Sequence, residues 1–369
     1  MKAKLWLLVV GSVLSGAVAV AASYVGPGDI KPFDMWWGFR AYSAAYATAG
    51  GPCATIRRGS DSSTLTINAT ASGACDASGI AAFAGTDAVC TGSISGGAVG
   101  LPPKWATLTI TSCSSGAIHW GDQIFAPQYP LPLYVTCTAI EPLDCNTGYT
   151  GTGGAGTYQV NTNEALPTAT ITFQVPLFAA TLNDQTGNGH DLVQVDTTKQ
   201  PLVLYPCREN RPCTSTQSGD WYLGASSFTT IHNPFSISAV ALNYPFAASF
   251  TPVIGTGGQT FLAFDNNATF QAACEGGGVV INAPQAENEP HSLLCVLNGA
   301  FSVLYVDGTY ISGTTGTANL TAPHWQSNFI ANIACCGQNY EGGIIESAVN
   351  STEAAQLLSN QSAFWGTPW

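Results

Sequence analysis

The side chains that could do chemistry in this sequence are mainly carboxylates near expected strand ends and turns of the second half. They are Asp184, Asp191, Asp220, Asp265, Glu275, Asp307, Glu341 and Glu346. Two carboxyl groups about 5 to 5.5 Å apart can cleave a glycosidic bond with retention of configuration, one as nucleophile and one as proton donor. We take Asp184 and Glu341 as the candidate catalytic pair.

Other kinds of catalytic or metal site have less support. No Gly-x-Ser-x-Gly sequence marks a nucleophilic serine. No Cys-x-x-Cys pair occurs and only five histidines are present, at positions 119, 190, 232, 291 and 324. We therefore expect no metal ligands and no cofactor; structural calcium is compatible with the sequence but is not indicated by it.

The cysteine pattern predicts a disulfide framework. The twelve cysteines are Cys53, Cys75, Cys90, Cys113, Cys137, Cys145, Cys207, Cys213, Cys274, Cys295, Cys335 and Cys336. An even number in an exported chain favours disulfides over a metal site. Short loops favour the pairs Cys207 with Cys213 and Cys274 with Cys295, each stabilising by about 2 to 4 kcal/mol.

The first 22 residues have the layout of a secretory signal. A basic start, Met1-Lys2-Ala3-Lys4, precedes an apolar run from Leu5 and then small residues. The run is roughly 16 residues, shorter than the ~20 needed to cross a membrane. We expect residues 1–22 to be removed, leaving no membrane span and a protein that is secreted, periplasmic or on the cell surface.

Composition narrows the partners and the fold. Only 9% of residues are charged and the net charge is −12, which disfavours nucleic acid and anionic membranes as partners. A neutral polysaccharide or glycan fits better. The 40 glycines and 21 prolines, with few lysines and glutamates, argue against long exposed helices. The sequence therefore predicts a mainly β protein.

A Gly/Thr-rich stretch at 93–174 is predicted to be a small inserted β module. Alternating segments at 105–111 and 168–175 bound it, with Leu108 and Ile110 on one face of the first. The segments SSGAIHWGDQIF and GYTGTGGAGTYQVN resemble a small all-β module that recurs in bacterial surface and phage-associated proteins, which implies a spacer or adhesin-like decoration. A disordered linker is the alternative.

The flanking parts, 23–92 and 175–369, resemble one domain. The segments MWWGFRAYSAAYATAGGPCATIRRGSDSSTLTI, GIAAFAGTDAVC and LNDQTGNGHDLVQVDTTKQPLV are similar to the opening of the α-L-arabinofuranosidase B catalytic domain, glycoside hydrolase family 54. LNGAFSVLYVDGTYISG resembles a strand pair of laminin G-like domains. These resemblances imply a concanavalin A-like (laminin G-like) jelly-roll sandwich. Near the end, Asn350 and Glu353 have the spacing of a helix capping box.

The resemblance fails where that family keeps its catalytic acids. The family has its proton donor in a Gly-Gly-Asp-Asn loop, whereas Cys336-Gly337-Gln338-Asn339-Tyr340 stands at that place here. The family's Glu-rich nucleophile region also has no counterpart between Tyr222 and Phe235. Fold likeness alone does not carry the mechanism over.

Residues for sugar contact are predicted around this departure. A bond between Cys335 and Cys336 would give a flat apolar platform beside Tyr340; the alternative is that each pairs elsewhere, for example with Cys274 or Cys295. Aromatic rings can stack on sugars, although most pack in the core. The candidate carbohydrate-binding residues are Trp221, Tyr222, Cys335, Cys336, Asn339 and Tyr340.

Three functions follow as alternatives. The first is an exported protein that binds a glycan, such as one containing arabinose, without cleaving it. The second is an active α-L-arabinofuranosidase-type retaining hydrolase with relocated carboxylates. The third is a structural surface or appendage protein. The missing acids favour the first.

Overall fold

The computed structural model describes thirteen stretches of the chain. They are residues 23–95, 106–119, 121–124, 133–136, 154–160, 165–216, 223–225, 227–243, 250–255, 260–265, 271–286, 289–325 and 337–369. The predicted signal at 1–22 lies outside them. Within these stretches, no helix combines the length and apolar character needed to cross a membrane.

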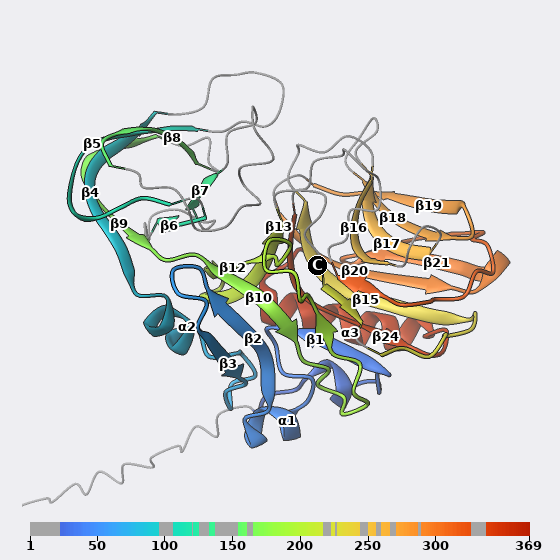
Figure 1. Ribbon diagram of the computed structural model, residues 1–369. Coiled ribbons are helices and arrows are strands. Elements are labelled where there is room, and N and C mark those ends of the chain that lie inside the picture. Colours follow the sequence, from blue (N-terminus) through green and yellow to red (C-terminus); the bar gives the residue numbers. More distant parts are fainter. Residues whose placement is uncertain are drawn as a thin grey trace, which may run out of the picture.

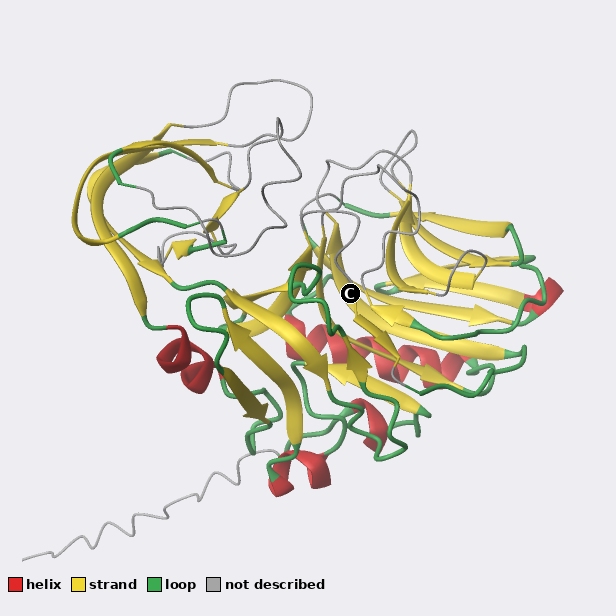
Figure 2. Cartoon of the chain, viewed as in Figure 1, coloured by secondary structure: helices red, strands yellow, loops and turns green. Residues whose placement is uncertain are grey.

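Strands dominate the described chain and build a β-sandwich, as the sequence predicts (Figure 2). One layer has the order β22 (Thr309–Gly313), β21 (Ser302–Val306), β20 (Pro290–Leu297), β15 (Phe235–Asn243) and β24 (Gly337–Ile345). Both β1 (Met35–Gly38) and β13 (Arg211–Thr216) also pair with β24, along different parts of its length. Strand β24 is thus the centre of this layer.

The second layer is a longer antiparallel series. Its order is β19 (Val279–Pro284), β18 (Gln271–Gly276), β17 (Thr260–Asp265), β16 (Phe250–Gly255), β23 (His324–Trp325), β14 (Leu223–Ala225), β11 (Leu192–Val193), β10 (Leu177–Leu182), β2 (Pro52–Arg58) and β3 (Thr64–Asn68). Strand β12 (Leu202–Arg208) pairs with both β10 and β13, so it joins the two layers. The main core includes Trp37, Ile237 and Phe264.

A long C-terminal helix covers the outer face of the layer that contains β24 (Figure 1). Helix α3 (Ser351–Trp365) begins at Asn350, whose side chain accepts from the Glu353 amide, while Glu353 accepts from the Asn350 amide. This is the capping box that the sequence predicts. Leu357 and Leu358 bury the apolar side of the helix in a cluster with Leu294 of β20. Two short helices, α1 (Ala44–Ala49) and α2 (Ala77–Ala84), lie before the barrel described next.

Strands between Thr86 and Gln174 form a closed barrel beside the sandwich (Figure 1). Its strands are β4 (Thr86–Ser95), β5 (Ala106–Gly116), β8 (Gly156–Val160), β7 (Leu133–Thr136), β6 (Gln123–Ile124) and β9 (Leu166–Gln174), in that order around the barrel. Leu108 and Ile110 are buried in a core of its own while Thr107 and Thr109 are exposed. The barrel thus takes up its first strand at Thr86, whereas the sequence placed the module at 93–174. These paired strands are not the disordered linker considered as the alternative.

Side chains of the barrel fasten it to β12 of the sandwich. Gln123 donates from Nε2 to the Val203 carbonyl at 2.7 Å, and its Oε1 accepts from the Tyr205 amide at 3.0 Å. The Tyr205 hydroxyl donates to Gln174 at 2.7 Å. Because Gln123 is only 2% exposed, these hydrogen bonds form a dry contact between the two bodies.

Four disulfides lie within the described residues: Cys53–Cys75, Cys90–Cys113, Cys207–Cys213 and Cys274–Cys295. The last two are the pairs that short spacing favoured. Since Cys274 and Cys295 bond to each other, neither is the partner considered for Cys335 or Cys336. Those two cysteines lie outside the described residues, as do Cys137 and Cys145.

Candidate functional site

Glu341 lies in β24, beneath helix α3. A β-bulge interrupts the pairing of β24 with β15 at Tyr340, and Glu341 stands opposite Val240. The Glu341 side chain is fully buried, and its Oε1 is 3.3 Å from Nη1 of Arg40. Gln361 and Trp365 of α3 also approach its carboxyl group. The helix-covered face of the sheet, rather than an open cleft, therefore surrounds this acid.

The Arg40 side chain, like that of Glu341, is buried and held by several contacts. Its Nε donates to the Tyr24 hydroxyl at 2.9 Å, and its Nη2 donates to the Val25 carbonyl at 3.1 Å. Its guanidinium lies 4.4 Å from the centroid of the Phe364 ring. Burial raises the pKa of Glu341, and the positive charge of Arg40 only partly opposes that rise. The pair is a structural ion pair beneath α3.

Asp184 organises the turn that follows β10. Its Oδ1 accepts from the amides of Trp36 and Thr186 at 3.2 and 3.1 Å, and its Oδ2 accepts from the His190 amide at 3.1 Å. The turn also holds Gly187 and Gly189 in the left-handed region, with φ of 88° and 80°. This is the Asx-rich turn that the sequence predicts.

The two candidate acids thus interact with different groups of the protein. Asp184 binds the backbone of β1 at Trp36, while Glu341 stands opposite Gly38 of the same strand. Asp184 is 8% exposed and Glu341 is fully buried. A nucleophile and a proton donor must both reach a sugar. Their role as a catalytic pair stays a prediction.

Asn339 and Tyr340, two of the residues predicted to bind carbohydrate, are buried. Asn339 donates from Nδ2 to the Val253 carbonyl at 2.9 Å, so it links β24 to the opposite layer. The Tyr340 hydroxyl donates to Gln338 at 2.7 Å, and its ring packs edge-on against Trp365. Burial raises the pKa of Tyr340. The other predicted contacts, Trp221, Tyr222, Cys335 and Cys336, lie outside the described residues.

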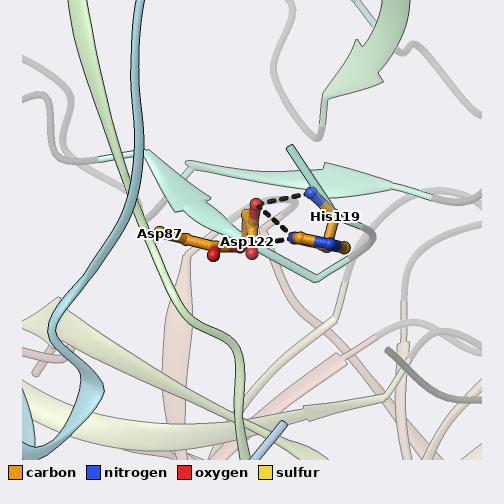
Figure 3. A group of neighbouring side chains, drawn as sticks. All are labelled: Asp87, His119 and Asp122. Atoms are coloured by element: carbon orange, nitrogen blue, oxygen red, sulfur yellow. Dashed lines mark hydrogen bonds and ion pairs between the residues drawn. The ribbon is translucent and has the colours of Figure 1, made fainter. Parts of the chain in front are cut away.

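A cluster that the sequence did not suggest lies at the end of the barrel. Asp87 of β4 and the turn residues His119 and Asp122 converge there (Figure 3). His119 Nδ1 is 2.6 Å from Asp87 Oδ2 and 4.0 Å from Asp122 Oδ2. The Asp122 carboxylate also accepts from the His119 amide at 2.6 Å. Among the described residues, this is the group of His, Cys, Asp and Glu side chains close enough to share a metal ion.

Asp122 is the most constrained member of this cluster. It is fully buried, and its Oδ1 has no hydrogen-bond partner. Burial raises its pKa well above the ordinary range, with a further rise from the charge of Asp87, although the His119 amide opposes it. The three-residue spacing of His119 and Asp122 was visible in the sequence. Asp87 could be added only once β4 was paired in the barrel.

The fold is a β-sandwich similar to that of solved arabinofuranosidase structures. The chain is similar to a GH54 α-L-arabinofuranosidase variant soaked with 4-nitrophenyl α-L-arabinofuranoside, with a TM-score of 0.55 and 13% identity over 92% of this chain and 66% of that one. An arabinofuranosidase complexed with arabinofuranosyl-α-1,2-xylobiose matches with the same TM-score and identity, over 92% and 65%. The chain thus spans slightly less than two thirds of these structures.

Similarity to other solved structures is weaker. A Trypanosoma rangeli sialidase matches with a TM-score of 0.37 and 10% identity, over 48% of this chain and 30% of that one. No family model and no curated protein matches the sequence. The similarity to arabinofuranosidases therefore concerns the fold.

Proposed function

We propose that this chain is an exported carbohydrate-interacting protein that binds a glycan through an arabinofuranosidase-B-like sandwich without cleaving it. The proposal rests on one observation: the fold resembles that of arabinofuranosidases, but both candidate acids are engaged in interactions that hold the structure together. The Asp184 carboxylate accepts hydrogen bonds from three backbone amides, and Glu341 is buried in an ion pair with Arg40. Neither carboxylate can serve a sugar without giving up these interactions.

An arabinose-containing polysaccharide is the proposed ligand. The solved structures with a similar fold include an arabinofuranosidase complexed with arabinofuranosyl-α-1,2-xylobiose. The low charge of this chain suits a neutral polymer, since a charged ligand is usually met by side chains of opposite charge. The four disulfides seen in the described part of the chain fit an oxidising compartment, to which the proposed signal at 1–22 would deliver the protein.

The first experiment measures binding and cleavage side by side. Purified oxidised protein without residues 1–22 is incubated with insoluble arabinoxylan and with arabinose-free xylan, and the bound fraction is measured after sedimentation. We expect retention on arabinoxylan that falls in Trp221→Ala. Trp369→Ala, at an exposed tryptophan, is the matched control and should bind as the parent does.

Hydrolysis of 4-nitrophenyl α-L-arabinofuranoside is measured on the same preparation, together with Asp184→Asn and Glu341→Gln. We expect no turnover above that of buffer in any of them. Turnover that disappears in either variant, while circular dichroism shows that the variant is folded, would establish the retaining hydrolase and overturn the non-catalytic proposal. Equal retention on both polymers would reject arabinose as the recognised feature.

A further inference from the structure

We propose that Asp87, His119 and Asp122 bind one divalent cation of the zinc type where the barrel meets the sandwich. In Figure 3, three side chains from two separate parts of the chain turn their polar ends toward one point. One ligand atom from each residue can be chosen so that all three lie within 4.8 Å of one another. An ion at that point would draw the three ligand atoms together to the closer spacing of a coordination sphere.

The excess of negative charge in the cluster independently favours a bound cation. Two carboxylates lie beside one imidazole, so even a protonated His119 balances only one of them. Asp122 is fully buried and its Oδ1 has no hydrogen-bond partner. The neighbouring carboxylate of Asp87 can accept hydrogen bonds but donates one only when protonated. A buried carboxylate without compensation is costly, and either an extra proton or a cation removes that cost.

The chemistry of the ligands selects the kind of cation. Calcium and magnesium prefer oxygen ligands, whereas an imidazole nitrogen with carboxylate oxygens suits zinc and similar transition metals. Three protein ligands leave a fourth tetrahedral position for water. Tetrahedral ligand atoms around zinc are about 3.3 Å apart, so the 2.6 Å contact between His119 and Asp87 must widen when the ion enters.

The exposure of the three side chains fits this movement. The side chains of His119 and Asp87 are 11% and 12% exposed, whereas that of Asp122 is fully buried. Asp87 at the rim can therefore shift toward solvent while Asp122 stays fixed by the His119 amide. Gln123, the residue after Asp122, binds Val203 and Tyr205 of the sandwich. Ion binding would thus reinforce the junction between barrel and sandwich.

The test is titration calorimetry with zinc chloride on untagged protein that has been treated with a chelator and dialysed. We expect one zinc ion per chain, weaker binding of calcium, and a higher thermal midpoint with zinc. His119→Gln and Asp122→Asn should each weaken zinc binding by at least about tenfold. His232→Gln, at an exposed histidine outside the cluster, should leave binding unchanged.

Asp87→Asn provides a second reading if Asp122→Asn does not fold, because Asp87 lies at the rim and its loss leaves the His119 amide bonded to Asp122. Zinc bound with equal affinity by the parent and by all folded cluster variants would overturn the site. So would an absence of stoichiometric binding, which would mean that the carboxylates share a proton instead. Tighter binding of calcium than of zinc would overturn the assigned type of ion.

Discussion

Replacing Arg40 with methionine is the perturbation that most directly tests the structural role of Glu341. Arg40 and Glu341 have side chains that are 1% and 0% exposed, so removing the arginine leaves a carboxylate in a dry environment. Breaking a buried pair by removing one partner typically costs about 3 to 5 kcal/mol. We expect Arg40→Met to lower the free energy of unfolding by this amount at pH 7.

A cycle of four proteins separates the pair from its surroundings. Urea unfolding at 25 °C is measured for the parent, Arg40→Met, Glu341→Gln and the double variant. Glu341→Gln should relieve the charge left behind, so the double variant should lose less stability than Arg40→Met alone. Arg58→Met is the matched control: its ion pair with Asp61 has side chains 29% and 47% exposed, and its loss should cost about 0 to 1 kcal/mol.

The pH dependence has a defined sign. Because burial raises the pKa of Glu341 in the folded protein, protonation favours the folded state, and stability falls as pH rises from the ordinary glutamate pKa through the raised one. Glu341→Gln should flatten the stability curve in that window. In Arg40→Met, where the opposing positive charge is gone, the loss should be smaller at pH 4.5 than at pH 7. A loss below about 1 kcal/mol at pH 7, or one that is equal at both pH values, would refute the account of a buried charge pair.

Two further predictions concern His291 and the disulfides. Burial alone would lower the pKa of His291, but the hydrogen bond and charge of Asp307 and the hydrogen bond to the Ala286 carbonyl outweigh burial and raise that pKa. The stability that His291 contributes is therefore present below the ordinary histidine pKa and is lost as pH rises through the raised one. Urea unfolding of His291→Gln from pH 5 to 8 should lack this decline in stability, and an unchanged decline would contradict the prediction. Replacing both cysteines of Cys274–Cys295 by alanine should lower the free energy of unfolding by about 1 kcal/mol more than replacing both cysteines of Cys207–Cys213, because the sequence separations are 21 and 6 and a disulfide that closes a longer loop stabilises more. If the two variants lose equal stability in thermal and urea unfolding, loop closure is not the main effect.

Local patterns predicted the elements of this protein well. Alternation at Leu108 and Ile110 predicted a half-buried strand because side chains in a strand point to opposite faces in turn. The capping box at Asn350 and the turn around Asp184 were also readable, since each is closed by hydrogen bonds between residues only a few positions apart. These features need no information from distant parts of the chain.

The candidate site was less accessible to sequence reasoning. Whether Glu341 faces a ligand or a helix depends on the bulge at Tyr340 and on the packing of α3, and both arise from contacts between distant segments. The sequence showed that an acid was present, but it did not show that Arg40, 301 residues away, would neutralise it. The cluster of Asp87 with His119 was missed for the same reason.

The sequence by itself therefore determined the mainly β character, the jelly-roll resemblance and the short-range pairing of cysteines, because strand periodicity, turn residues and small loops act locally. Tertiary structure alone decided which polar groups meet. Burial sets the charge and availability of a carboxylate, and burial depends on strand register and on the elements that cover each face. For this protein those long-range contacts placed Glu341 under α3 and brought Asp87, His119 and Asp122 together.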